Sequence, residues 1–104
     1  MPVGRMALAA ILIALPCTMA VAEDAAVRQG AKIYENNCST CHGEDLQNNS
    51  RIAFDLRRLR GDERARFVNS VLHGKNVMPP WEGKLTDDQI ESLWAYIRAN
   101  AYDK

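Results

Sequence analysis

Two cysteines three residues apart, followed at once by a histidine, are the residues of this chain best suited to chemistry. They are Cys38, Cys41 and His42, in the run Cys38-Ser39-Thr40-Cys41-His42. On one helical turn the side chains at i, i+3 and i+4 lie on one face, so both sulfurs and the ring can address one flat macrocycle. The spacing predicts covalent haem attachment, with Cys38 and Cys41 as the thioethers and His42 as the proximal iron ligand.

Two other chemistries also use closely spaced cysteines. A redox-active pair of the thioredoxin type should lie among alternating strands and helices, and the sequence shows no such alternation. A zinc site needs further Cys or His ligands, and only His73 remains beyond the motif. Haem attachment is therefore favoured over both.

Met78 is the second candidate ligand, in the run Asn76-Val77-Met78-Pro79-Pro80-Trp81. Its thioether is a soft, neutral ligand, and two prolines stiffen the loop that would present it to iron as the distal ligand. Methionine also commonly fills gaps in a core. His73 and an open sixth position are the competing alternatives. The choice matters, because an open position would permit gas binding or peroxidase chemistry, whereas His/Met ligation favours electron transfer.

Residues 1–22 are predicted to be a cleavable secretory signal peptide. Arg5 is the positive flank, residues 6–16 form an apolar run too short to span a bilayer, and Ala20-Val21-Ala22 offers small residues to a signal peptidase. Cleavage is expected before Glu23, which leaves residues 23–104 as one periplasmic domain without membrane insertion. A lipoprotein anchor at Cys17 is a weaker match, because a proline precedes that cysteine.

The charge balance gives no reason to expect nucleic acid as a partner. The chain has 13 basic and 13 acidic residues, and loss of Arg5 leaves 12 basic residues (13 − 1). Five arginines interleave with acidic residues, which favours a solvated mixed face. They are Arg57, Arg58, Arg60, Arg64 and Arg66. Pairing of Arg57 or Arg58 with a haem propionate is the alternative.

The apolar pattern predicts an all-α fold class with no convincing strand pair. A first helix is expected over residues 25–37. Gly30 within it suggests close approach of another backbone, and simple tolerance of a glycine in the helix is the alternative. A second helix is expected over residues 62–72, with Gly74 positioned to stop it.

The last helix has the clearest local signals. Thr86 and Gln89 form a capping box, and the apolar repeat predicts an end near Asn100. Before the second helix, residues 48–50 indicate a turn. Ile52, Phe54 and Leu56 alternate as in a short extended segment, which is expected to wall one side of the cofactor.

With these motifs in place, the chain resembles the small class I bacterial cytochromes c over residues 27–100. In that family the N- and C-terminal helices cross tightly. Gly30 and Tyr34 match the first helix, and the partner face would be Leu93, Trp94 and Ile97. The resemblance implies a cytochrome c fold whose loops wrap one covalent haem c, and a one-electron carrier that is not an enzyme.

One departure from the family pattern concerns the proximal histidine. Many members orient it through the carbonyl of a proline shortly after the haem motif, but this chain has no proline between His42 and Pro79. Another carbonyl must therefore orient His42, and the sequence does not identify it.

A narrower likeness is to cytochromes that take electrons from periplasmic PQQ-dependent alcohol dehydrogenases. It is carried by Phe54-Asp55-Leu56-Arg57, Arg66-Phe67, Gly74-Lys75, Met78-Pro79 with Trp81, and Leu93-Trp94-Ala95-Tyr96. This likeness implies a monomer that carries electrons from a quinoprotein dehydrogenase to the respiratory chain and its terminal oxidase. A generic respiratory shuttle, a permanently bound subunit of a dehydrogenase or oxidase, and a haem enzyme or gas sensor remain alternatives.

Overall fold

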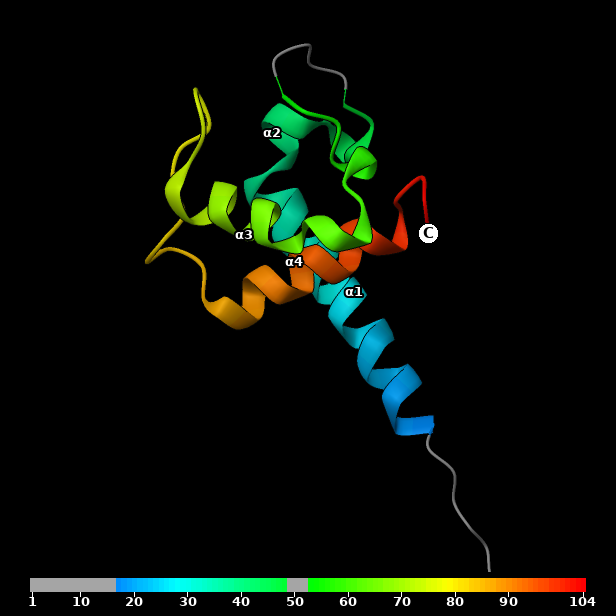
Figure 1. The fold of residues 1–104 in the computed structure, drawn as a ribbon. Helices are drawn as coiled ribbons and strands as arrows, with labels where there is room; N and C mark the ends of the chain where they lie inside the picture. Colours follow the sequence, from blue (N-terminus) through cyan, green and yellow to red (C-terminus); the bar gives the residue numbers. More distant parts are fainter. Residues whose placement is uncertain (1–16, 49–52) are drawn as a thin grey trace, which may run out of the picture.

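Helices and short helical turns make up the architecture. The computed structural model describes residues 17–48 and 53–104, so Ile52, most of the expected turn and the apolar run of the signal lie outside the described residues. The described parts form no β-strand beyond two isolated bridges, and the predicted all-α class is confirmed. The elements shown in Figure 1 are α1 (Cys17–Asn37), α2 (Ser39–His42), η1 (Glu44–Leu46), η2 (Leu56–Arg58), η3 (Gly61–Glu63), α3 (Arg64–His73) and α4 (Asp87–Ala99).

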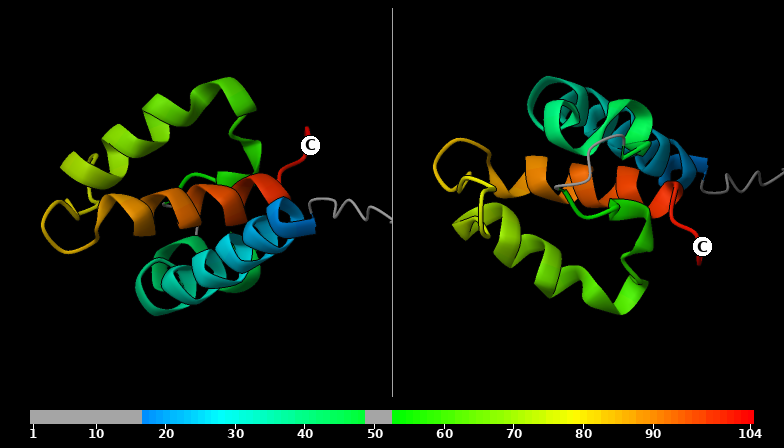
Figure 2. Two further views of the ribbon diagram at one scale, coloured as in Figure 1. Left: turned by 90° about the horizontal axis from the view of Figure 1, so that it is seen from below. Right: turned by 90° about the horizontal axis from the view of Figure 1, so that it is seen from above.

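Helix α4 is the centre of the packing. Both views in Figure 2 place it between α1 on one side and α3 on the other. The largest fully buried side chains come from α1, η1 and α4, and they are Tyr34, Leu46, Ile90, Leu93 and Ile97. Helix α1 begins before the expected residue 25, and its N-terminal part extends away from the other helices (Figure 1). Within the described ranges no helix is long and apolar enough to cross a membrane.

Helices α1 and α4 cross with their backbones in contact at Gly30, as the sequence indicated. A Cβ atom on Gly30 would lie 1.9 Å from the carbonyl oxygen of Ser92 and 2.8 Å from Cβ of Tyr96. The ring centroids of Tyr34 and Tyr96 lie 5.4 Å apart beside this contact. Only a residue without a side chain allows this approach.

The partner face predicted for α4 is partly wrong. Leu93 and Ile97 are buried, but the ring of Trp94 packs against Phe67 of α3, with 5.3 Å between centroids. At ~3.6 residues per turn, Trp94 lies about 200° around the helix from Ser92. Helix α4 is packed on two sides, so Trp94 contacts α3, whereas Ser92 and Tyr96 contact α1.

The ends of α3 and α4 follow the local signals. Thr86 Oγ1 accepts a hydrogen bond from the Gln89 backbone N–H at 3.1 Å, and Gln89 Oε1 accepts one from the Thr86 N–H at 2.8 Å. Helix α4 then runs to Ala99, with Asn100 as its cap. Helix α3 starts slightly later than expected, because residues 61–63 form a 3₁₀ turn, and Gly74 ends it at φ +79°.

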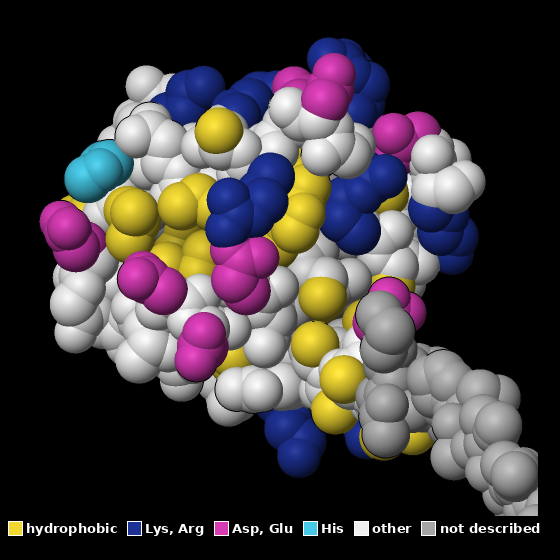
Figure 3. Space-filling model, turned by 60° about the horizontal axis from the view of Figure 1, so that its bottom comes forward, with side chains coloured by type: hydrophobic (Ala, Val, Ile, Leu, Met, Phe, Trp, Pro, Cys, Tyr) yellow, Lys and Arg dark blue, Asp and Glu magenta, His cyan; other side chains and the backbone are white. Residues whose placement is uncertain are grey.

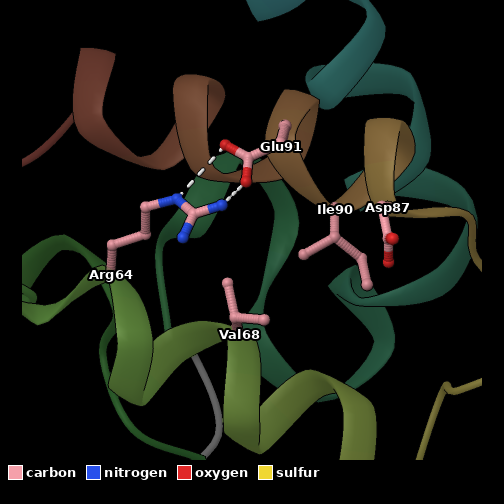
Figure 4. A pocket seen from close by; sticks show the side chains of 5 residues that line it. All are labelled: Arg64, Val68, Asp87, Ile90 and Glu91. Carbon is pink, nitrogen blue, oxygen red and sulfur yellow. Dashed lines mark hydrogen bonds and ion pairs between the residues drawn. The ribbon is translucent and has the colours of Figure 1, made fainter.

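The arginine-rich segment forms a mixed face, as predicted. Arg57 pairs with Asp55, Arg60 with Asp62 and Arg66 with Glu63. Arg64 pairs with Glu91 across α3 and α4, above Val68 and Ile90 (Figure 4). Basic and acidic side chains also lie next to one another on the face shown in Figure 3. Exposed pairs of this kind contribute only about 0–1 kcal/mol each, so they shape the surface more than they stabilise the fold.

We expect Gly30→Ala to destabilise the protein strongly. The new Cβ atom would collide with the backbone of α4, which cannot move aside as a side chain can, at a cost of about 3 kcal/mol. Gly61→Ala is the matched control, because its Cβ atom would meet only the end of Arg98, at 3.4 Å. Chemical unfolding curves of both variants check this, and equal stabilities would contradict it.

Candidate functional site

The two motif cysteines and His42 lie on a single helical turn, as predicted. The Cys38 N–H donates to the Tyr34 carbonyl at 2.8 Å, so the turn continues directly from α1. The His42 N–H donates to the Cys38 carbonyl at 3.0 Å and closes α2. Cys38, Cys41 and His42 therefore have a fixed relation to one another, and all three line the same cavity.

That cavity has a volume of about 690 Å³ and opens inside the hydrophobic core. Cofactor sites in proteins typically span roughly 300–1,000 Å³, whereas packing voids in a small domain are few and small. Most of its walls are apolar side chains that also belong to the core, and these are Leu59, Phe67, Val71, Leu93 and Ile97. The core is thus built around a space for a large apolar group.

Met78 lines this cavity and His73 does not. His73 is an exposed residue in the last turn of α3. The structure therefore brings Met78 together with the Cys–His turn and separates the competing histidine from it.

The carbonyl that orients His42 is that of Phe54. His42 Nδ1 lies 3.0 Å from this oxygen, and since a carbonyl can only accept, Nδ1 carries the proton. Nε2 is then left with its lone pair, the form that binds a metal. Burial lowers the pKa of His42, although the Phe54 carbonyl opposes that shift, so the neutral imidazole is favoured. The sequence could not identify this partner, because every residue has a carbonyl.

The segment that carries Phe54 differs in part from the expected extended strand. Phe54 and Leu56 both line the cavity, as predicted, but Leu56 begins the 3₁₀ turn η2. The Asp55 side chain accepts a hydrogen bond from the Arg57 N–H at 3.1 Å and so favours a turn over an extended chain.

Two further hydrogen bonds hold the chain that follows His42. The buried Tyr34 hydroxyl donates to the Gly43 carbonyl, and the Asn48 N–H donates to the His42 carbonyl at 2.8 Å. Burial raises the pKa of Tyr34, so its hydroxyl remains a donor across the physiological range. The end of α2 is therefore anchored to α1.

The surroundings of the haem-attachment motif do not fit the two rival chemistries. Burial, and then the neighbouring Cys41, raise the pKa of the Cys38 thiol to about 11, whereas redox-active pairs have a lowered thiol pKa. Among residues 17–48 and 53–104, no three His, Cys, Asp or Glu side chains gather as a metal site would require. This leaves the zinc interpretation without a ligand set in the described residues.

Met78 sits on a tight turn that is fixed to α3. Lys75 and Met78 exchange two backbone hydrogen bonds, at 3.1 and 2.9 Å. The Trp81 N–H donates to the Val71 carbonyl at 2.8 Å and ties the end of the loop back to the helix. A Cβ atom on Gly74 would lie 2.6 Å from the Met78 carbonyl oxygen, so Gly74 is required for the contact as well as for ending α3.

The basic residues that line the cavity are Arg66 and Lys75. Arg57 and Arg58, named as the alternative propionate partners, do not line it. The Arg57 guanidinium instead binds Asp55 through two hydrogen bonds of 3.1 and 3.3 Å. Asp55, two residues before Arg57 in the chain, therefore holds this guanidinium, in line with the predicted mixed face of arginines and acidic residues.

The donor set fits a covalently bound haem. Apolar walls suit the porphyrin, two thiols and an imidazole share one helical turn, and a thioether faces the same space from a rigid loop. Arg66 and Lys75, which line the cavity, can pair with the carboxylates that such a macrocycle carries.

Comparisons with known proteins agree with this geometry. The family model described as cytochrome C oxidase, cbb3-type, subunit III matches residues 25–97. Cytochrome c6 of Thermosynechococcus vestitus is 36% identical over 93 residues, which cover 85% of this chain and 83% of that protein. The Cbb3-type cytochrome c oxidase subunit CcoP of Azospirillum brasilense is 32% identical over 82 residues, and FixP of Bradyrhizobium sp. is 33% identical over 75 residues. These matches cover 70% and 67% of this chain, but only 28% and 26% of the two oxidase subunits.

We expect Gly74→Ala to destabilise the loop that carries Met78. The substitution adds a clash with the Met78 carbonyl to the cost of a positive φ angle, together about 2–3 kcal/mol. Gly83→Ala is the control, because Gly83 has nearly the same φ, +82°, with no atom within 4 Å of its Cβ position. Thermal unfolding of both variants measures the difference, and an equal loss in the two would show that the contact with Met78 contributes nothing.

Proposed function

Because the chain belongs to the class I cytochrome c family and carries covalent haem c, we propose that Cys38, Cys41, His42 and Met78 hold this haem. Cys38 and Cys41 would form the thioethers that attach the haem, and His42 and Met78 would supply the nitrogen and the sulfur that bind its iron. The observation that carries the proposal is that all four side chains line one apolar cavity from two rigid supports.

The haem supplies a reversible one-electron change at its iron. The chain supplies the surroundings that make this change easy. The Phe54 carbonyl orients the His42 ring, and the close approach of Gly74 to the Met78 carbonyl fixes the backbone of Met78, so both side chains are held in place. The buried walls exclude water and limit solvent rearrangement. If His42 and Met78 both bound the iron, they would leave no open position on it for a substrate, and this supports a role as an electron carrier rather than an enzyme.

The carrier works in the periplasm in this proposal, after removal of residues 1–22. Exposed residues on both sides of the cleavage site support this, since Val21 to Ala25 are all exposed on the part of α1 that extends from the other helices. The donor is a PQQ-dependent alcohol dehydrogenase, on the strength of the sequence motifs in residues 54–57 and 93–96. The acceptor lies in the respiratory chain.

Electron transfer takes place across the cavity mouth beside Met78. Val77 is 80% exposed there, and Pro79 and Pro80 are exposed as well. Transient redox encounters use small interfaces, and an apolar patch of this kind suits one.

A second candidate is a permanently bound subunit of an oxidase. It is favoured by the similarity to CcoP and FixP, of which this chain spans about a quarter. Size-exclusion chromatography of the native protein separates the two, because a free carrier elutes as a monomer and a subunit elutes in a large complex.

The main test combines mass analysis with Met78→Ala. The secreted protein should gain the mass of one haem, and its ferric form should show the weak near-infrared band of a methionine sulfur. In Met78→Ala we expect loss of that band, carbon monoxide binding to the reduced form, and a potential lower by on the order of 0.1 V, because axial ligands span ~0.8 V.

His73→Ala is the control for this experiment. His73 is exposed and lies outside the cavity lining, so its removal should leave the band and the potential unchanged. Loss of the band in His73→Ala, or its survival in Met78→Ala, would overturn the assignment of Met78.

A separate prediction concerns the carboxylates of the haem. We expect Arg66→Gln to lower the reduction potential and to move its pH-dependent step to higher pH, because a carboxylate that loses a guanidinium has a higher pKa. Arg58→Gln is matched to it: both guanidinium carbons lie over the Phe54 ring, at 5.8 Å for Arg58 and 4.8 Å for Arg66, but only Arg66 lines the cavity. Potentiometric titration of both variants should show the step displaced in Arg66→Gln alone.

A further inference from the structure

A cluster outside the cavity joins the C-terminal segment to the turn after Phe54. We define this C-terminal clasp as Asp55, Arg57 and Tyr102. The Tyr102 hydroxyl donates to Asp55 Oδ2 at 2.9 Å, and the Tyr102 N–H donates to the Arg57 carbonyl at 3.0 Å. The Arg57 guanidinium lies 5.0 Å over the Tyr102 ring and binds both carboxylate oxygens. Together with the hydrogen bond from the Arg57 backbone N–H, the Asp55 carboxylate accepts four hydrogen bonds.

The clasp is one peptide bond away from the acceptor of His42. The Phe54 carbonyl that accepts the His42 Nδ1–H belongs to the same rigid peptide plane as the Asp55 nitrogen. The direction of this carbonyl therefore depends on how firmly Asp55 is held.

Phe54 itself cannot fix this carbonyl by burial. Phe54 is 38% exposed, and the guanidinium groups of Arg58 and Arg66 lie over its ring. The Asp55 side chain is only 16% exposed and is fully engaged. Burial alone would raise the pKa of Asp55, but hydrogen bonds from Arg57 and Tyr102 lower it below its ordinary value, so the carboxylate stays ionised at neutral pH.

We propose that Asp55 and Tyr102 are positioning residues that hold the Phe54 carbonyl on His42 and thereby set the reduction potential. The proposal rests on the proposed role of His42 as an iron ligand. A strong hydrogen bond from Nδ1 makes the imidazole a better electron donor, and this favours ferric iron and a lower potential. A weakened clasp lets the carbonyl turn away and raises the potential.

Tyr102→Phe tests the proposal without changing any charge. It keeps the ring over Arg57 and removes only the hydroxyl that binds Asp55. We expect a higher potential and about fivefold faster solvent exchange of the His42 Nδ1–H in the reduced protein, the factor that corresponds to a hydrogen bond worth ~1 kcal/mol. Asp55→Asn should raise the potential further, because it also removes a negative charge near His42.

Asp103→Asn is the control. Asp103 follows Tyr102, and its carboxylate pairs with Arg98 at 2.7 Å rather than with Asp55, Arg57 or Tyr102. At high ionic strength, where exposed charges are screened, this variant should leave both the potential and the exchange rate unchanged. If Tyr102→Phe lowers the melting temperature but moves neither quantity, the clasp is only structural and the proposal is overturned. If His42 did not bind the iron, the optical spectrum of the unaltered protein would show it, and this result does not depend on the variants.

Discussion

The fold depends on an apolar cavity that the helices enclose but do not fill. Leu59, Phe67, Val71, Leu93 and Ile97 belong both to the hydrophobic core and to the cavity wall. In most small domains such side chains would meet one another, and unfilled space on this scale would be strongly destabilising. About 82 residues remain after the predicted signal, too few for a large core of their own. The haem of this cytochrome c has the size and apolar character to complete the core, and we therefore expect folding to depend on its attachment.

The features that sequence reasoning predicted are those set by neighbours along the chain. The Thr86–Gln89 capping box, the stop at Gly74 and the helical turn of the Cys–His motif all involve residues three or four positions apart. Their geometry is fixed by helix periodicity and needs no knowledge of the tertiary structure. Gly30 is an informative intermediate case: a glycine within a helix predicted a close backbone contact, and α4 provides it, but the sequence misassigned part of the face that makes the contact.

The features that could not be predicted from the sequence depend on residues far apart in the chain, or on groups that every residue has. The Phe54 carbonyl is 12 residues from His42 and has no chemical signature of its own. Tyr102 and Asp55 are 47 residues apart, and their contact exists only because the chain after α4 returns to η2. The interleaved charges predicted a mixed face, and Arg57 pairs with Asp55 accordingly, but the charge pattern did not identify Arg66 and Lys75 as the basic residues that line the cavity. Composition and periodicity do not encode such pairings.

The two proposed iron ligands are held by opposite kinds of support, and this bears on how an electron carrier can be tuned. Met78 lies on a turn whose backbone is fixed by steric contact with Gly74 and by the Trp81–Val71 hydrogen bond. That support is close-packed, so most changes there cost stability. His42 is held through a chain of hydrogen bonds that ends at Tyr102, which is 63% exposed. Substitutions at an exposed end cost little stability, since little apolar area is lost. In the proposed haem site, the side that carries His42 is therefore where substitutions can change the potential without loss of the fold, and the side that carries Met78 is where the ligand is kept in place.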